Sequence, residues 1–347
     1  MVKVIEPGRR TGTVVIPSSK SIAHRELIAA ALSGVEPPLI RGESNDTRAT
    51  RECLRAMMAG ESAWRCGESG TTLRLLEPLA GVMGWKGAFV CEGRLGERPR
   101  LPFARQSRYV VPGNVSSQFV SGLLMALPLA DWDSEIAIDG ALQSASYVRL
   151  TEDVLVAAGI RFERTGKGSS GDPFVWRVPG RQHYRIAGGR EVEGDWSQAA
   201  FFLAKGVEVK GLNPASHQGD RAVVDILARL NAADGGGSVT VDMADCPDLY
   251  PAMAAYAAAR NFNVAFTGTE RLRLKESDRL ASTAALIESV RRGEPVDCCG
   301  DHRIAMSAAV MACFAKHPVT VIGAECVAKS YPRFWDDFEA LSTGASE

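Results

Sequence analysis

The residues best suited to chemistry are basic side chains at or near the starts of apolar, Ala/Leu-rich segments. Lys20 and Arg25 flank the first such segment, Arg279 precedes another, and Arg303 follows a histidine at a third. At equivalent positions lie small residues that can donate hydrogen bonds to an oxyanion: Ser21, Gly70, Thr71, Ser116 and Ser117. A helix N-terminus has unpaired N–H groups and a partial positive charge, which favour anions. If these starts converge, they form a site for phosphates and carboxylates. For any one start taken alone, the alternative is ordinary N-capping and solvated surface charge.

Six helical segments share this form, and their order along the chain indicates an internal repeat. They begin at residues 20, 70, 116, 194, 247 and 302. All steps but one are about fifty residues long, which is typical of a repeat architecture. The long step follows residue 116 and splits the six segments into two sets of three. The spacing therefore predicts two domains, with a crossover between about residues 150 and 194.

Short β-prone runs alternate with these helices and with further amphipathic ones. They include Thr13–Ile16, Ala88–Cys91, Glu135–Ile138, Val239–Val241, Val264–Thr267 and Val319–Ile322. This alternation predicts an α/β or α+β fold built of repeated units.

The composition excludes several classes of protein. Lys and Arg number 40 against 41 Asp and Glu, so there is no basic excess typical of a nucleic-acid binder. No apolar stretch reaches the roughly 18–20 residues that cross a bilayer. The first ten residues, MVKVIEPGRR, lack the apolar core of a secretory signal, so a cytoplasmic protein is expected. Eight cysteines occur without a CxxC or a zinc-finger spacing, so reduced thiols and no metal site are expected.

Nine motifs, in order along essentially the whole chain, resemble those of the 5-enolpyruvylshikimate-3-phosphate synthases. They are VIPSSKSIAHRELIAAAL, GESGTTLRLL, GERP, SSQFVSGLLMALPLA, VEGDWSQAAFFLA, CPD, RLKESDRLA, GDHRIAMSAAVMA and CVAKSYPRFW. The resemblance implies the two-domain, inside-out α/β barrel of the enolpyruvyl transferases, with three βαβαββ-like repeats per domain. It implies a discontinuous C-terminal domain of residues 1–18 and 194–347, an N-terminal domain of residues 19–193, and an active site in the cleft between them.

The resemblance also implies a reaction. The family transfers the enolpyruvyl group of phosphoenolpyruvate to the 5-hydroxyl of shikimate 3-phosphate, releases phosphate and uses no cofactor. The reaction belongs to the shikimate pathway, which leads to chorismate and the aromatic amino acids, and the family is the target of glyphosate. The expected partners are these two small-molecule substrates, with no nucleic acid and no membrane, and a monomer is expected.

Site residues follow from the resemblance by position. For shikimate 3-phosphate they are Lys20, Ser21, Arg25, Ser116, Ser117, Gln118, Ser144, Tyr147, Asp248 and Lys275. For phosphoenolpyruvate they are Lys20, Gly70, Arg98, Gln118, Arg279, Arg303 and Lys329. The catalytic candidates are Lys20, Asp248 and Glu276. His24, where the family often has Asn, is interpreted as a neighbour of the site rather than a catalyst.

The chemistry of these residue types suits that reaction. Seven cations would face only two acids, Asp248 and Glu276, a balance that favours two polyanionic substrates. Arg forks onto carboxylates and phosphates, each charge-assisted bond contributing about 1.5–3 kcal/mol. Addition followed by elimination needs a base at the hydroxyl and an acid at the methylene carbon, roles that two carboxylates and a lysine can fill. Which carboxylate serves which carbon is left open.

The chain departs from the family in two ways. It is shorter, with the shortening between the motifs, so several repeats are expected to have lost an outer strand pair. Arg271 stands where the family commonly has Asn.

Three alternatives compete with this interpretation. The sister enzyme that transfers enolpyruvate to UDP-N-acetylglucosamine relies on a loop cysteine, whereas here Cys91 lies only at the edge of the equivalent loop. A non-catalytic relative would not need both acids. RNA-end processing on a related repeat fold lacks support from charge and motifs.

Overall fold

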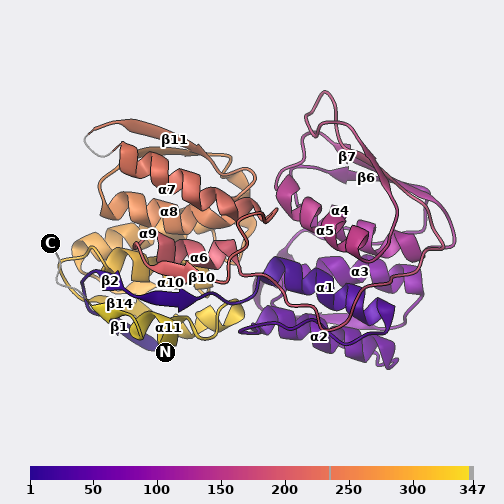
Figure 1. The fold of residues 1–347 in the computed structure, drawn as a ribbon, viewed down its shortest axis with the longest axis horizontal. Coiled ribbons are helices and arrows are strands. Elements are labelled where there is room, and N and C mark those ends of the chain that lie inside the picture. Colours follow the sequence, from indigo (N-terminus) through magenta and orange to yellow (C-terminus); the bar gives the residue numbers. More distant parts are fainter. Residues whose placement is uncertain (234–235, 344–347) are drawn as a thin grey trace. The chain divides into compact units, whose positions relative to one another are not determined.

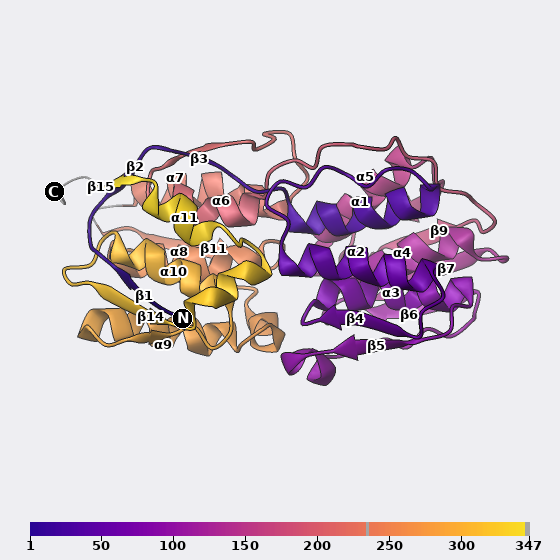
Figure 2. The same ribbon diagram turned by 90° about the horizontal axis from the view of Figure 1, so that it is seen from below.

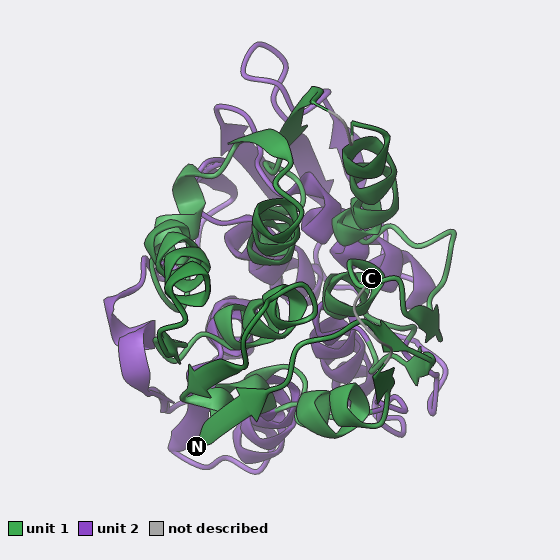
Figure 3. Ribbon diagram, turned by 90° about the vertical axis from the view of Figure 1, so that its left-hand side faces the viewer, with its two compact units in different colours: residues 1–18, 42–44, 193–347 green, residues 19–41, 45–192 purple. Residues whose placement is uncertain are grey.

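The computed structural model describes residues 1–233 and 236–343, which form two compact units (Figure 3). Unit 1 comprises the described residues of 1–18, 42–44 and 193–347, and unit 2 comprises residues 19–41 and 45–192. The expected division differs by placing residues 42–44 in the other domain and by starting the later segment at 194. The assignment of 42–44 has a local cause, because a Cβ on Gly42 would lie 3.0 Å from the Cβ of Pro17.

One segment of unit 2 has the full strand–helix–strand–helix–strand–strand order. It comprises β6 (Arg108–Pro112), α4 (Ser117–Ala126), η2 (Leu127–Leu129), β7 (Ser134–Asp139), α5 (Ala145–Ala157), β8 (Glu163–Thr165) and β9 (Val175–Val178). Strand β6 pairs in parallel with β7, and β9 lies antiparallel between β7 and β8. Figure 1 shows β6 and β7 alongside α4 and α5.

The first part of unit 2 is shorter. It comprises α1 (Lys20–Ser33), α2 (Asn45–Met58), β4 (Ala63–Gly67), α3 (Gly70–Met83), β5 (Ala88–Cys91) and η1 (Gly93–Glu97). Strands β4 and β5 form a two-stranded parallel sheet, and α3 connects them.

Unit 1 also uses short parallel strand pairs, two of which are connected by helices. Its strands are β1 (Val2–Ile5), β2 (Arg10–Thr11), β3 (Thr13–Val15), β10 (Glu208–Lys210), β11 (Ser238–Asp242), β12 (Asn263–Thr267), β13 (Val296–Asp297), β14 (Val319–Ile322) and β15 (Ser342–Thr343). Its helices are α6 (Trp196–Leu203), η3 (Gly219–Ala222), α7 (Val223–Ala232), η4 (Pro247–Leu249), α8 (Tyr250–Ala259), η5 (Glu270–Leu274), α9 (Arg279–Arg292), α10 (His302–Ala312), η6 (Ala324–Lys329) and α11 (Phe334–Glu339).

The pairs in unit 1 are β3–β10, β11–β12 and β13–β14, all parallel. Strand β1 adds to the free edge of β14 in the antiparallel sense, and Figure 2 shows the two strands side by side. Strands β2 and β15 form a small antiparallel pair.

The mixed helix and strand content confirms the predicted α/β class. Sheets of two or three strands, in place of the four-stranded β6–β9 arrangement, agree with the expectation that several repeats are shortened. The closed barrel and the threefold repeat in each domain stay predictions. Among the described residues, no helix combines the length and the apolar character needed to cross a membrane.

Three of the six predicted helix starts agree with the structure, whereas those predicted at 194 and 247 precede α6 and α8, which begin at Trp196 and Tyr250. Helices α1, α3 and α10 begin at the predicted residues Lys20, Gly70 and His302. Helix α4 begins one residue later than predicted, because Ser116 is its N-cap and its hydroxyl accepts a bond from the N–H of Gln118.

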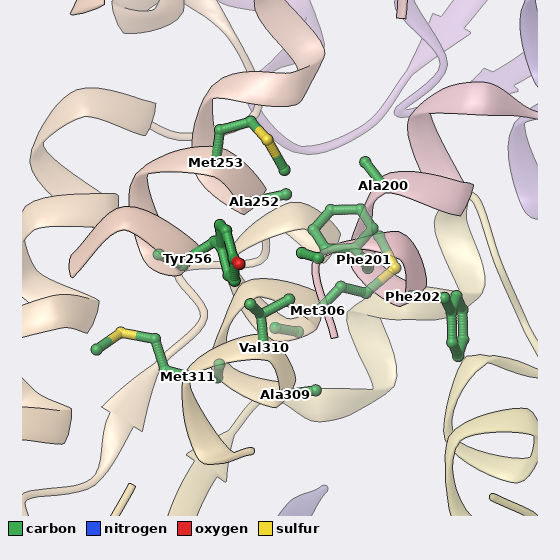
Figure 4. Close-up of a cluster of buried hydrophobic side chains, with 14 of the residues drawn as sticks. Ala200, Phe201, Phe202, Ala252, Met253, Tyr256, Met306, Ala309, Val310 and Met311 are labelled. Atoms are coloured by element: carbon green, nitrogen blue, oxygen red, sulfur yellow. The ribbon is translucent and has the colours of Figure 1, made fainter. Parts of the chain in front are cut away.

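The core of unit 1 is formed by α6, α8 and α10. Every residue of α10 is buried, so the helix is covered on all sides. Figure 4 shows Phe201 of α6, Met253 of α8 and Met306 of α10 among the side chains of this cluster. Because the core holds the bodies of these helices, their N-terminal ends are fixed relative to one another within the unit.

Lys205, just after α6, is an ionisable side chain buried at this apolar core. Its Nζ lies 4.2 Å from the ring centroid of Phe338 and 4.5 Å from that of Phe202, and it has no hydrogen-bond partner among the described residues. Burial lowers its pKa from 10.5 to about 7, with a further lowering by Arg10 and a partial offset by Cys313. Cation–π contact offsets only part of such a cost.

Lys205→Met is therefore expected to raise the free energy of unfolding by several kcal/mol at pH 6. Below pH 7 Lys205 is charged in both the folded and the unfolded state, so the folded wild type has the full cost of a buried charge. Between pH 7 and 10.5 Lys205 is neutral in the folded state and protonated in the unfolded state. The destabilisation therefore decreases as the pH rises toward 10.5. The gain should therefore shrink between pH 7 and 10. Urea unfolding at four pH values measures it, with exposed Lys210→Met as the control. A gain independent of pH would contradict the assignment.

Candidate active site

A cluster of alternating charges lies at the starts of α8, α9 and α10 in unit 1. Its centre is Arg279, which is 1% exposed and donates to three carboxylates. The distances are 2.8 Å from NH1 to Oδ1 of Asp248, 2.6 Å from NH2 to Oε2 of Glu276, and 2.8 Å from Nε to Oδ2 of Asp301. A guanidinium with three anionic partners is held in one orientation.

Asp248 is the carboxylate on which three cations meet. Besides Arg279, it accepts from NH2 of Arg303 at 2.9 Å and from Nζ of Lys275 at 3.4 Å. Arg303 also donates to the backbone carbonyl of Asp248 and to the hydroxyl of Ser197. The structure thus brings together five of the predicted residues: Asp248, Lys275, Glu276, Arg279 and Arg303.

These contacts set the charge states of the cluster. Burial alone would raise the pKa of Asp248, but Arg303, Lys275 and Arg279 hold it well below its usual value. Burial lowers the pKa of Lys275, and Asp248 only partly offsets this. Burial alone would lower the pKa of Arg279, yet Asp301, Glu276 and Asp248 raise it. The cluster therefore holds an ionised aspartate beside a lysine that loses its proton more readily than usual.

Sequence reasoning missed Asp301, which supports the whole cluster. It caps α10 by accepting from the N–H of Arg303, and the same carboxylate accepts from Arg279 and from the hydroxyl of Ser277. The available signal was an aspartate directly before a helix start, which is a typical N-cap. Lys329, the remaining predicted cation of unit 1, is buried in η6, which packs against α10. Arg271 donates to the carbonyl of Ala244 at 3.1 Å.

Unit 2 carries a second group of predicted residues, beginning with Lys20. Its Nζ lies 2.8 Å from Oδ2 of Asp46, a partner in the first turn of α2 that sequence reasoning also missed. Lys20 in unit 2 and Arg279 in unit 1 are each paired with an aspartate outside the predicted set, so each group is less cationic than its predicted residues alone.

Arg25 has extensive protein contacts. It is 1% exposed, its Nε donates to Thr151 at 2.7 Å, and its NH2 donates to Ser121 at 3.2 Å and to the carbonyl of Tyr147 at 2.9 Å. Its NH1 donates to the carbonyl of Ser21. Burial among neutral partners lowers its pKa to about 10. Arg25 therefore connects α1 with α4 and α5, and Ser21 and Tyr147 contact it through their backbones.

Gln118 connects the starts of α3 and α4. Its Nε2 donates to Thr71 at 2.8 Å, and its Oε1 accepts from NH1 of Arg74 at 2.8 Å. Arg74 lies in a matched motif but was not among the predicted site residues. A Cβ on Gly70 would lie 2.9 Å from NH1 of Arg74 and 3.3 Å from NH1 of Arg98. Glycine therefore lets two guanidiniums approach the start of α3.

The remaining predicted residues of unit 2 lie at helix starts. Ser116 is the N-cap of α4, so ordinary capping applies there, and Ser117 is buried in its first turn. Ser144, which directly precedes α5, has a φ of 55°, a left-handed conformation that is uncommon for serine. Among residues 1–233 and 236–343, no three His, Cys, Asp or Glu side chains are grouped as metal ligands would be.

Comparison with known proteins places this arrangement in a family. An EPSP synthase from Acinetobacter baumannii matches the structure with a TM-score of 0.69 at 20% identity, covering 97% of each chain. The fold is thus that of EPSP synthases. Residues 4–64, 101–290 and 286–338 match the family model described as EPSP synthase (3-phosphoshikimate 1-carboxyvinyltransferase). The chain belongs to the EPSP synthase family.

Two relatives show how similar the chain is in sequence to proteins of this family. The 3-phosphoshikimate 1-carboxyvinyltransferase of Clostridium kluyveri is 35% identical over 418 aligned positions, covering 97% of this chain and 96% of the relative. That of Clostridium acetobutylicum is 32% identical, covering 99% and 98%. An alignment of 418 positions exceeds the 347 residues present, so the Clostridium kluyveri protein has segments that this chain lacks.

Proposed function

We propose that this chain transfers the enolpyruvyl group of phosphoenolpyruvate to the 5-hydroxyl of shikimate 3-phosphate and releases phosphate. It is a transferase of the shikimate pathway. The observation that carries the proposal is the cluster around Arg279 and Asp248, in a chain that belongs to the EPSP synthase family. The proposal includes action in the cytoplasm, as a monomer, without a cofactor, nucleic acid or membrane partner.

In the proposed reaction, a new bond forms between the 5-oxygen and C2 of phosphoenolpyruvate. The hydroxyl proton leaves and the methylene carbon gains a proton, which gives a tetrahedral intermediate. The bond between C2 and the phosphate oxygen then breaks, phosphate departs, and the methyl carbon returns a proton to the protein. Asp248, Glu276 and Lys20 are the groups proposed to hold these protons.

The charges of the cluster support these roles. Asp248 remains ionised beside Lys275, so it can accept a hydrogen bond from a substrate hydroxyl. Arg279, Arg303 and Lys329 are proposed to bind phosphoenolpyruvate, together with Lys20, Gly70, Arg98 and Gln118 of unit 2. Ser21, Arg25, Ser116, Ser117, Gln118, Ser144 and Tyr147 are proposed for shikimate 3-phosphate, with Lys20, Asp248 and Lys275.

The test is phosphate release from phosphoenolpyruvate with shikimate 3-phosphate or UDP-N-acetylglucosamine as the acceptor. Release only with shikimate 3-phosphate is expected, and it would show that the missing segments are dispensable. Lys20→Met should abolish the release, because it removes the cation paired with Asp46. Release only with the nucleotide sugar, or none from folded protein, would overturn the proposal.

A further inference from the structure

A buried chain of hydrogen bonds connects α1, α2 and α3 in unit 2. His24 Nδ1 lies 2.6 Å from the hydroxyl of Thr50, which lies 2.6 Å from the hydroxyl of Thr72. The Thr72 hydroxyl lies 2.7 Å from Oγ of Ser69. All four residues are at most 1% exposed. We call these four residues the imidazole–hydroxyl relay.

The direction of donation along the relay follows from counting protons. The Thr72 hydroxyl has one proton and donates it toward Ser69, with the carbonyl of Asp46 at 3.3 Å as a second acceptor. With Thr72 as this donor, its oxygen accepts from Thr50, and the oxygen of Thr50 accepts from His24. This assigns the proton of the imidazole to Nδ1, and Nε2 is left as a buried acceptor without a hydrogen-bond partner among the described residues.

The imidazole is neutral. Burial, the ammonium of Lys20 and the guanidinium of Arg25 together hold the pKa of His24 well below its usual value. A proton on Nε2 would place a third positive charge beside these two cations. His24 can therefore serve as a fixed donor at neutral pH rather than as a general base.

The relay ends on groups that belong to the proposed site. Ser69 caps α3 by accepting from the N–H of Thr72, and it directly precedes Gly70. The carbonyl of Asp46 contacts the relay, and the carboxylate of the same residue pairs with Lys20. A displacement of Thr72 would therefore change the position of the start of α3 and of Asp46, the partner of Lys20.

We propose that His24 and Thr50 are positioning residues, which hold Gly70 and the Lys20–Asp46 pair in one arrangement for binding phosphoenolpyruvate. The inference rests on the proposed function of the chain. It assigns a role to a histidine that is fully buried.

The test compares Thr50→Val with Thr50→Ser. Valine has nearly the same shape but no hydroxyl, so it breaks the relay in the middle, whereas serine retains the hydroxyl. Thr50→Val is expected to raise KM for phosphoenolpyruvate about ten- to a hundredfold, since a small misplacement of binding groups has effects of this size. Thr50→Ser should stay within about threefold of the wild type, and His24→Phe should resemble Thr50→Val.

The control is Ile136→Val, which shortens a fully buried side chain of β7 outside the relay. It measures what a loss of packing in the same unit does to KM. Equal kinetics for Thr50→Val and Ile136→Val, or a Thr50→Ser variant as impaired as Thr50→Val, would overturn the inference.

Nitrogen NMR of the His24 ring separates failure of this inference from failure of the proposed function. The wild type should show a protonated Nδ1 and a bare Nε2 from pH 6 to 8, a pattern that Thr50→Ser keeps and Thr50→Val changes along with the Gly70 amide signal. A folded wild type that releases no phosphate with shikimate 3-phosphate or UDP-N-acetylglucosamine would refute the proposed function but not the relay. A His24 spectrum and a Gly70 signal unchanged by Thr50→Val refute the relay.

Discussion

Arg279→Met should destabilise unit 1 by about 3–5 kcal/mol and lower kcat/KM at least a hundredfold. Removing one partner of a buried ion pair leaves an uncompensated charge, and a cost of this size is typical. Asp301 is 0% exposed and loses its guanidinium, while Asp248 loses an ion-pair contact of 2.8 Å and Glu276 one of 2.6 Å. Loss of one well-placed cationic donor also weakens stabilisation of transferred charge. Urea unfolding and phosphate release measure the two effects.

The matched control is Arg273→Met in the neighbouring η5. Arg273 pairs with Asp278 at 3.1 Å, but its side chain is 62% exposed. An exposed pair contributes about 0–1 kcal/mol, so this variant should unfold and react almost like the wild type. Arg279→Met with the stability of Arg273→Met would show that the buried cluster does not hold the unit together.

Asp248→Asn should lower kcat by about 10²–10⁴ while the protein stays folded, because the amide cannot accept a proton as the carboxylate does. The variant should also change the pH profile. Asp248 raises the pKa of Lys275 against the lowering by burial, so its loss lowers that pKa further. If Lys275 acts as an ammonium, the alkaline limb of activity should move to lower pH.

The pH profile of kcat with shikimate 3-phosphate, from pH 5 to 10, checks this expectation. Asp225→Asn provides the control, since Asp225 is an exposed carboxylate in the first turn of α7. A limb that does not move in Asp248→Asn, with kcat still reduced, would leave the proton role of Asp248 intact but exclude Lys275 as the titrating group. An unchanged kcat would exclude both roles.

Local features of the fold were predictable because local interactions decide them. Helix starts depend on caps and periodicity within a few residues, so Lys20, Gly70 and His302 were predicted correctly. Strands β4 and β6 were missed. Both pair with strands more than twenty residues further along the chain, β5 and β7, and the β-prone part of β6 is only Tyr109–Val111.

The motifs were sufficient to place the chain in its family and to select Asp248, Lys275, Glu276, Arg279 and Arg303, which meet in one cluster. The sequence alone therefore determined the α/β class and the residue types of the candidate site. Only the tertiary structure showed that Asp301 pairs with Arg279, that Asp46 pairs with Lys20, and that Arg25 donates a hydrogen bond to Thr151, 126 residues away. Such partners are decided by the path of the chain in space, because a charge or a hydrogen bond acts over a few ångströms whatever the distance along the sequence.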